Sequence, residues 1–499
     1  MHFLINSLCI LFLLVLPVRA IEPTTVPILR VETGMHSALI RRIVVDQQNN
    51  RLVTCSDDKT IRIWQLPENR LVKTLRVPID SSHEGQLFGL AVSPDGKSIA
   101  AGGWTGWDWD GKASVYLFDV TTGELIRRID GFRDAISALV WSPDGKYLAV
   151  GLQGRAGLDI VRISDGKVIA SDKQYLDKLT DLSFAANGRL LAIALDGMAR
   201  LYNNNFKLIG RKNIPGGKKP VAVKFTPDAN RFAVGFHDMP VVSVMSGKDM
   251  SFQYHVDSAG LDNQANLFTV TWSADGQYLY AGGEYRGDGL NPLYRWSDSG
   301  KGQREEIPLS RLRITEIQQM SEGNIAFATE DPGFGVVEAN GKTLSYQKSD
   351  VIDYSDIGSQ FKISNDALLV SYPVEGDEKE NFIFSALSAG DQSLKQKVDD
   401  ELYPPIQGSN NFKIENWKDS YELTVNGKKP LMDDYEISRS YAISPDDEKV
   451  LLGTEWAIRL LDKDAKEIWS QKLAAVAWAV NISRNGKLAV AALSDGSIR

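Results

Sequence analysis

The stretch ISALVWSPDGKYLAV, residues 136–150, contains the pattern that decides the fold. Two short segments with alternating apolar residues, Ile136–Trp141 and Tyr147–Val150, flank the turn sequence Ser142-Pro143-Asp144-Gly145-Lys146. Proline fixes φ at the first corner of a turn, aspartate bonds its own backbone, and glycine accepts a positive φ. The stretch therefore predicts two antiparallel strands joined by a tight turn.

The same pattern recurs along the chain, with related turn segments beginning at residues 93, 186, 226, 273, 444 and 483. Each pair of strands is followed by a third, such as Val115–Phe118, and a polar turn then leads to a fourth, such as Leu125–Ile129. The predicted third strands end near Trp64, Phe118, Arg162, Tyr202, Met245, Trp296, Glu338, Ala386, Val425 and Leu461. A period of about forty residues with four antiparallel strands in each unit predicts an all-β fold built from propeller blades.

The first repeat carries the most specific motif, Leu52-Val-Thr-Cys-Ser-Asp-Asp-Lys-Thr-Ile-Arg-Ile-Trp64, preceded by His36. It resembles a blade of the WD40 family, and the resemblance covers most of the chain from residue 25 onward. In that family a histidine, a strand-two hydroxyl, a turn aspartate and a strand-three tryptophan bond together inside the blade. The resemblance assigns these structural roles to His36, Thr54, Asp58 and Trp64, and not catalytic roles.

Seven of the predicted third strands lie between Trp64 and Glu338, so we expect residues 25–347 to close one seven-bladed propeller. Val26–Val31 is expected to be a detached outer strand that completes its last blade. Residues 348–499 supply about four further repeats of an incomplete second propeller. Because the last repeat stops within a strand, we expect the chain to continue beyond Arg499.

Residues 1–20 predict a signal peptide, since an apolar run from Leu4 to Leu16 is followed by small residues at Val18 and Ala20. Cys9 would leave with that segment, and Cys55 in a strand is expected to be a buried, inert thiol. A large exported chain without a disulfide is typical of the bacterial periplasm, with secretion as the other destination.

The composition argues against two classes of partner. With 56 basic and 64 acidic residues, the formal net charge is −8. An acidic chain is a poor ligand for nucleic acid or for anionic lipid. No later stretch is apolar enough for membrane insertion once the signal is removed.

Two loop insertions are candidate binding faces. The first contains Trp104, Trp107, Asp108, Trp109 and Asp110, which could form a platform for a sugar or a peptide. A hairpin packed on its own blade explains this loop better, since loop aromatics are often buried against their own support.

The second insertion, in blade six, contains Tyr285, Arg286 and Asp288. Its equivalent position predicts that it projects from the same side of the ring as the first, although Asp288 also fits a simple turn. The sequence contains no zinc-like spacing of histidines and cysteines, no phosphate loop and no enzyme signature, so we expect no metal, no cofactor and no catalytic residue.

The leading functional hypothesis is a non-catalytic scaffold that binds a protein or peptide. The repeat style also resembles exported bacterial WD40 proteins in which a caspase-like peptidase domain follows the propellers, which implies a regulatory or recognition role for this part. The alternative is a periplasmic propeller that binds a small ligand or a sugar, or an enzyme, similar to the Tol-associated type.

Overall fold

The fold is described from a computed structural model of the chain. The described residues are 34–499 except 81–82, 263–264, 285–288, 321–322, 350–353, 355–356, 374–380, 386–401, 434–435 and 474. The expected signal peptide, the expected strand Val26–Val31 and the loop residues Tyr285, Arg286 and Asp288 lie outside them.

Seven four-stranded antiparallel sheets follow one another along the first two thirds of the chain, and each sheet is built from four consecutive strands. We call them blades one to seven, and together the first ring. Their strands are β1 to β4 (Ile40–Asp46, Arg51–Ser56, Thr60–Gln65, Arg70–Arg76), β5 to β8 (Leu87–Val92, Ser98–Gly103, Ala113–Asp119, Leu125–Phe132), β9 to β12 (Ile136–Trp141, Tyr147–Leu152, Leu158–Arg162, Lys167–Asp172), β13 to β16 (Leu179–Phe184, Leu190–Ala194, Met198–Tyr202, Leu208–Asn213), β17 to β20 (Pro220–Phe225, Arg231–Phe236, Val242–Ser246, Phe252–His255), β21 to β24 (Thr269–Trp272, Leu279–Gly282, Asn291–Trp296, Arg304–Ser310) and β25 to β28 (Ile314–Gln319, Ile325–Thr329, Gly333–Val337, Thr343–Gln347).

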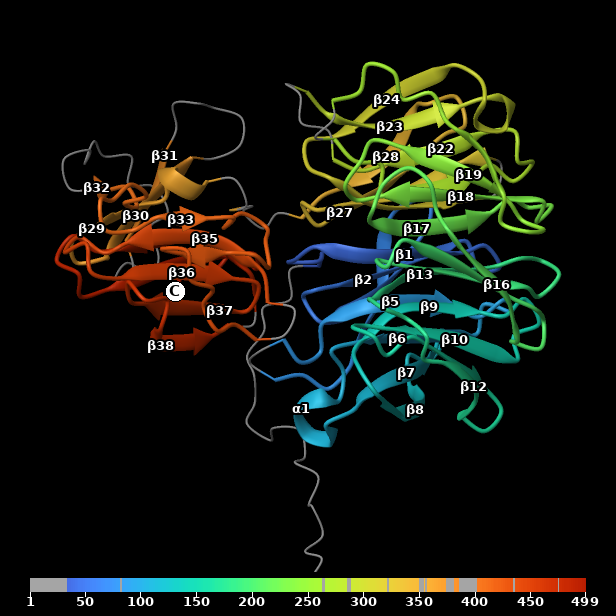
Figure 1. Cartoon of the computed structure of the whole chain (residues 1–499), viewed down its shortest axis with the longest axis horizontal. Helices are drawn as coiled ribbons and strands as arrows, with labels where there is room; N and C mark the ends of the chain where they lie inside the picture. The colour runs from blue at the N-terminus through green and yellow to red at the C-terminus, as the bar shows by residue number, and fades with distance from the viewer. Residues whose placement is uncertain are drawn as a thin grey trace, which may run out of the picture.

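The first ring is closed, because the first strand of each blade packs beside the first strand of the next and β25 packs beside β1. At this junction the Trp64 ring lies 4.6 Å from the Phe334 ring, within a cluster of buried residues from blades one and seven. The seven-bladed ring predicted from the repeats is therefore present (Figure 1). The outer strand of blade seven is β28, which comes from the same repeat as the rest of that blade, so the place expected for Val26–Val31 is filled by residues 343–347.

The recurrent turns have the geometry that their sequence predicts. In the turn at residue 142 the Ser142 hydroxyl donates to Asp144 at 2.6 Å, the Tyr147 N–H donates to Ser142, and Gly145 has a φ of +69°. The hydrogen bond from Ser142 lowers the pKa of Asp144. The side chains thus satisfy backbone groups at each corner, which fixes the register of the first two strands of a blade.

The first strand of nearly every blade carries a β-bulge one residue after it begins. The unpaired residues at these bulges are Arg41, Phe88, Ser137, Thr180, Val221 and Thr315. A bulge redirects a side chain out of the alternation of the strand. The same end of the first ring therefore carries six redirected side chains around its axis.

The remaining residues form a second unit of shorter sheets. Its strands are β29 to β32 (Lys362–Ser364, Leu369–Pro373, Asn381–Ser385, Leu402–Tyr403), β33 and β34 (Ile414–Glu415, Thr424–Val425), β35 to β38 (Ser438–Ile443, Val450–Thr454, Ala457–Leu461, Glu467–Lys472), and β39 and β40 (Ala477–Ile482, Ala489–Leu493). Only β35 to β38 form a four-stranded sheet in chain order among the described residues, because β32 pairs with β29 and not with β31. Two-residue strands such as β33 cannot build a regular blade, so this unit is less regular than the repeats predicted for residues 348–499.

The second unit lies against one end of the first ring, to the left in Figure 1. The described helices are short: α1 (Trp107–Asp110), which lies at the ring end facing the second unit, and the 3-10 turns η1 (Asp298–Gly300) and η3 (Gly358–Gln360). In the described part of the chain, no helix has the length and apolar character needed to cross a membrane.

Candidate functional site

The four residues assigned to blade one come together in a buried network. Nδ1 of His36 donates to Asp58 at 2.8 Å, Nε2 of His36 lies 2.6 Å from the Thr54 hydroxyl, and Nε1 of Trp64 donates to Thr54 at 2.9 Å. Thr60, which the sequence analysis missed, also donates to Asp58 at 2.7 Å. Burial alone would raise the pKa of Asp58, but His36 and these hydrogen bonds lower it. All these groups are enclosed in the blade, so the network holds the fold.

The tryptophan loop of blade two is packed on its own support. Trp104 and Trp109 are buried, whereas Trp107 is half-buried with its ring 5.8 Å from the ring of Trp104. Asp110 is exposed and pairs with Arg128. Of the three tryptophan rings, Trp107 is therefore the one that is partly accessible. A single partly accessible ring is a poor platform for a sugar.

A buried carboxylate fastens this loop. Glu84 accepts hydrogen bonds from the backbone N–H groups of Gly106 and of Asp108, whose own side chain is exposed. Burial raises the pKa of Glu84 to about 7, although the two backbone N–H groups oppose the shift. The loop is therefore packed against blade two and held there by these hydrogen bonds.

Arg42 crosses the axis of the first ring. Its guanidinium donates to Glu316 of blade seven at 2.7 Å and to the Thr180 carbonyl of blade four at 3.1 Å. Burial would lower the pKa of Arg42, but Glu316 and Asp181 raise it, so the side chain keeps its charge. Arg42 lines cavities on both sides of this crossing, and it divides the axial space of the ring.

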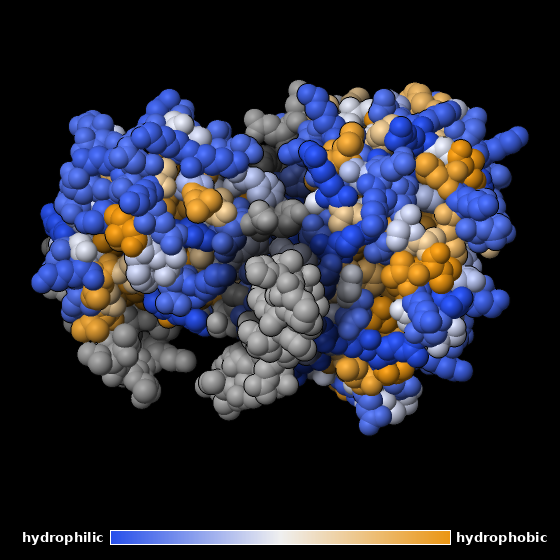
Figure 2. All heavy atoms as spheres, turned by 60° about the horizontal axis from the view of Figure 1, so that its bottom comes forward, coloured by the Kyte–Doolittle hydropathy of each residue, from blue (hydrophilic) through white to orange (hydrophobic). Residues whose placement is uncertain are grey.

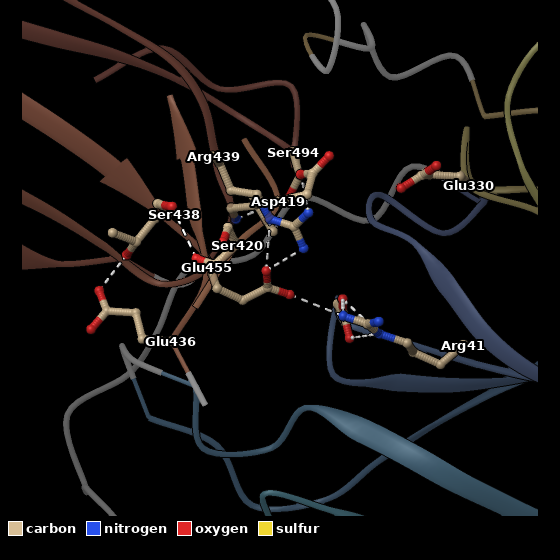
Figure 3. Close-up of polar contacts among 12 residues, drawn as sticks. Arg41, Glu330, Asp419, Ser420, Glu436, Ser438, Arg439, Glu455 and Ser494 are labelled. Atoms are coloured by element: carbon tan, nitrogen blue, oxygen red, sulfur yellow. Dashed lines mark hydrogen bonds and ion pairs between the residues drawn. The ribbon is translucent and has the colours of Figure 1, made fainter. Parts of the chain in front are cut away.

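A chain of ion pairs joins the first ring to the second unit. Arg41 donates to Asp57 at 2.7 Å and to Glu455 at 3.0 Å, and Arg439 donates to the other oxygen of Glu455 and to Asp419 (Figure 3). Arg41 and Arg439 occupy equivalent bulges, in β1 and β35. Burial would raise the pKa of Glu455, but the two arginines lower it. The two parts therefore meet through equivalent positions of two blades.

A cavity of about 230 Å³ lies above Arg42, between the ring end and the second unit; we call it the chamber. The six bulge residues of the first ring all line it, so the bulges direct these side chains toward the chamber. The second unit covers it with Tyr421, Ile437, Glu455 and Trp456. Trp456 is 2% exposed, and its ring lies 5.0 Å from that of His83.

A wider cavity of about 460 Å³ adjoins the chamber. The two share the lining residues Arg41, Phe268, Thr315 and Ile437. Arg313 and Glu330, which pair at 2.8 Å, line its other side. The wider cavity therefore extends the space beside the chamber toward Arg313 and Glu330.

The described residues contain no cluster of three or more side chains that could hold a metal ion. Cys55 is a free, buried thiol whose pKa is raised by burial, as expected for an inert cysteine. Glu284, the described residue that precedes Tyr285, Arg286 and Asp288 in the blade-six insertion, lines the wider cavity. That position places the start of the blade-six insertion at the same ring end as α1.

Of the residues that line the chamber, only Trp104 was singled out from the sequence. One signal was available, since the consecutive Arg41 and Arg42 stand in an otherwise apolar strand. Both arginines are needed there only because blades from opposite sides of the ring and the second unit bring carboxylates to them. Repeat counting does not reveal such partners.

Comparison with known proteins gives matches to the repeats. Residues 29–65, 70–116 and 123–159 match the family model described as "WD domain, G-beta repeat". Rat (Rattus norvegicus) coronin-7 is 28% identical over 131 residues, which cover 26% of this chain and 14% of coronin-7. A Caenorhabditis elegans protein, the probable cytosolic iron-sulfur protein assembly protein CIAO1 homolog, is 27% identical over 103 residues, or 20% of this chain and 28% of that protein. The chain therefore spans less than a third of either relative.

Among solved structures, the crystal structure of the β-propeller domain of Cps50 (Swd1) from Myceliophteria thermophila covers 60% of this chain and 96% of that chain. The TM-score is 0.49 and the sequence identity is 17%. The matched repeats lie within blades one to three of a closed ring of four-stranded blades, and the second and third matches each begin at the outer strand of the preceding blade. The first three blades therefore carry WD40 repeats, within a closed β-propeller ring.

Proposed function

We propose that this protein is a non-catalytic scaffold that binds a protein partner on the outer edge of the first ring. The observation that carries the proposal is an exposed aliphatic residue repeated on the outer strands. These residues, which we call the edge residues, are Val72, Ile126, Ile169, Ile209, Leu344 and, in the second unit, Ile468. Their exposed fractions lie between 36% and 54%.

The edge residues occupy equivalent places, because each is the unpaired residue of a β-bulge in its outer strand. A bulge interrupts the free edge and discourages pairing with another strand. The bulge also turns the aliphatic side chain outward. The geometry therefore favours apolar contacts with a folded partner over addition of a strand.

The ring end that carries the bulges of the first strands is covered by the second unit, whereas the edge residues on the outer strands are exposed. Figure 2 shows hydrophobic residues in separate clusters over the first ring, with hydrophilic residues between them. In blades two, three and four the residue before the edge residue is also aliphatic and exposed: Leu125, Val168 and Leu208. A partner that spans these three blades would gain several apolar contacts at once.

The proposed test replaces Ile126, Ile169 and Ile209 with glutamate together. A matched control places glutamate at Thr122, Ser164 and Asn205, which are exposed in the turns before the same strands. Crosslinking followed by mass spectrometry would identify partners of the unmodified protein. We expect a partner that the edge variant no longer captures and the control still captures. Equal capture by both variants would count against the edge surface.

The absence of catalysis has its own test. The purified chain is expected to hydrolyse no peptide or ester substrate, because the one histidine–aspartate pair of blade one is enclosed in the network with Thr54 and Trp64. Turnover that disappears when His36 is replaced, while the fold is retained, would overturn the scaffold proposal.

We also propose that residues 1–20 direct export to the bacterial periplasm or the medium and are then removed. The apolar run from Leu4 to Leu16 supports this proposal. N-terminal sequencing of the exported protein should begin at Ile21. A role in recruiting substrates for a caspase-like peptidase, as the resemblance implies, is tested by whether the captured partner is a substrate of such an enzyme.

A further inference from the structure

Four polar atoms that line the chamber have no hydrogen-bond partner within the described part of the chain. They are the Ser137 hydroxyl, the side-chain oxygen of Gln153, the Thr315 hydroxyl and the indole N–H of Trp456. Each of these residues is more than nine-tenths buried. Leaving a buried polar group unpaired costs about 1–3 kcal/mol, so native structures seldom leave several around one cavity without something to bind.

Lys178 adds a positive charge to the same space. It lines the chamber beside Arg41 and Arg42, whose guanidinium groups are engaged by carboxylates. The ammonium of Lys178, in contrast, has no hydrogen bond or ion pair with any described residue. Asp177 and Asp134 attract the ammonium electrostatically but do not line the chamber, so the chamber offers a cation without an ion-pair partner among the described residues.

We infer that the chamber binds a small hydroxylated anion, a sugar acid or a sugar phosphate, whose acidic group pairs with Lys178. The hydroxyl groups of such a molecule would donate to Gln153 and bond with Ser137 and Thr315, and an oxygen would accept from Trp456. This inference goes beyond the proposed scaffold function, because the ligand site lies between the two units and not on the outer edge.

The volume of the chamber and the residues that enclose it agree with this class of ligand. Its volume of about 230 Å³ lies below the range of about 300–1,000 Å³ that is typical of pockets for larger organic ligands. Trp456 belongs to the second unit, Ser137 and Thr315 belong to blades three and seven of the first ring, and Lys178 directly precedes β13 of blade four. A bound molecule would therefore connect the two units.

The test is isothermal titration calorimetry on the full chain with D-gluconate, glucose 6-phosphate, inorganic phosphate and neutral glucose. We expect gluconate or glucose 6-phosphate to bind, and whichever binds identifies the acidic group. Both inorganic phosphate and glucose should bind at least tenfold more weakly. Binding of neither hydroxylated anion, or equally tight binding of glucose or of inorganic phosphate, would overturn the inference.

Variants locate the site. Lys178→Met should weaken binding at least tenfold, since a hydrogen bond to a charged group is worth about 1.5–3 kcal/mol. Lys178→Arg should restore most of the affinity, and Lys173→Met, at an exposed lysine of the preceding segment, should change nothing. Trp456→Phe, which keeps an aromatic ring but removes the N–H, should weaken binding several-fold. Unchanged affinity in Lys178→Met would exclude this site.

Folding of the variants is a separate readout. Because Lys178 is an ammonium without a pairing partner among the described residues, Lys178→Met should leave the melting temperature unchanged or raise it. The ligand should raise the melting temperature of the unmodified protein and not of Lys178→Met.

The pH dependence gives a further check. Burial, together with Arg41 and Arg42, lowers the pKa of Lys178 to about 8, and Asp177 and Asp134 oppose the shift. Glu316, Glu455 and Tyr421 are the other ionisable groups that line the chamber. The anion needs the charged form of Lys178, so affinity should fall above pH 8 in the unmodified protein. The fall should be absent in Lys178→Arg.

Discussion

Replacing Thr54 with valine tests the buried network of blade one most directly. Valine has nearly the shape of threonine but lacks the hydroxyl, which accepts a hydrogen bond from Nε1 of Trp64 and bonds with Nε2 of His36. Since an indole N–H can only donate, the hydroxyl hydrogen of Thr54 is left for His36. The substitution therefore leaves two buried polar groups without a partner while it changes the packing little.

The expected cost follows from these two groups. His36 and Trp64 are no more than 1% exposed, so water cannot replace the lost hydroxyl. Each unpaired buried group costs about 1–3 kcal/mol, which gives a loss of about 2–6 kcal/mol in the free energy of unfolding. At about 2 °C for each kcal/mol in a large domain, the melting temperature should fall by at least about 4 °C.

Thr315→Val is the matched control. Thr315 is also buried, at 8% exposed, but its hydroxyl has no hydrogen-bond partner in the described part of the chain. The same chemical change should therefore cost no more than about 0.5 kcal/mol, and it can even stabilise the ring. Thr315→Val should instead weaken binding of the anion in the chamber.

The assay is urea unfolding of the full chain, with hydrogen exchange on peptides from β1 to β4 to assign the loss to the first ring. Exchange should accelerate in blade one and in the adjoining β25 to β28, because Trp64 also packs on Phe334. Equal destabilisation by Thr54→Val and Thr315→Val would refute the reasoning, since it would mean that the hydrogen bonds of Thr54 contribute nothing.

Three further predictions concern charged groups. Because the pKa of Asp58 is lowered in the fold, the charged Asp58 stabilises the protein above pH of about 4, and this contribution is lost below it. In urea titrations, the difference in stability between the unmodified protein and Asp58→Asn should therefore shrink from pH 5 to pH 3. Because burial raises the pKa of Glu84 to about 7, ionisation of this group should lower the stability of the fold as pH rises from about 4.3 to 7. Glu84→Gln should therefore gain stability relative to the unmodified protein over that interval. A stability difference between the two proteins that stays constant with pH would contradict the raised pKa. Glu455→Leu removes the carboxylate that Arg41 and Arg439 share and leaves them only Asp57 and Asp419, so the contact between the two units should weaken. Limited proteolysis should therefore cut between the two units faster, with Glu448→Leu, at an exposed position in the turn between β35 and β36, as the control.

Much of the first ring could be predicted from sequence because its information is local. A turn such as Ser142–Lys146 carries its own hydrogen bonds, and the alternation of strands such as Ile136–Trp141 decides which side chains are buried. Both features could therefore be predicted without knowing which distant residues they contact. The second unit was harder to predict because the strands over residues 402–425 are two residues long. The turn at Ser364, where the hydroxyl donates to Asp366, also contains neither proline nor glycine, whereas each of the other recurrent turns contains at least one of them.

The chain by itself determined the repeat, the type of blade and the residues that stabilise blade one, since these depend on neighbours within about forty residues. Only the tertiary structure decided that the ring end carrying the bulge residues is covered by the second unit, and that Arg41 meets Glu455 there. It also brought Lys178 and Trp456 to one chamber, from separate blades. The physical reason is that ring closure and packing of the second unit join residues hundreds of positions apart, and no periodic pattern encodes which charges they bring together.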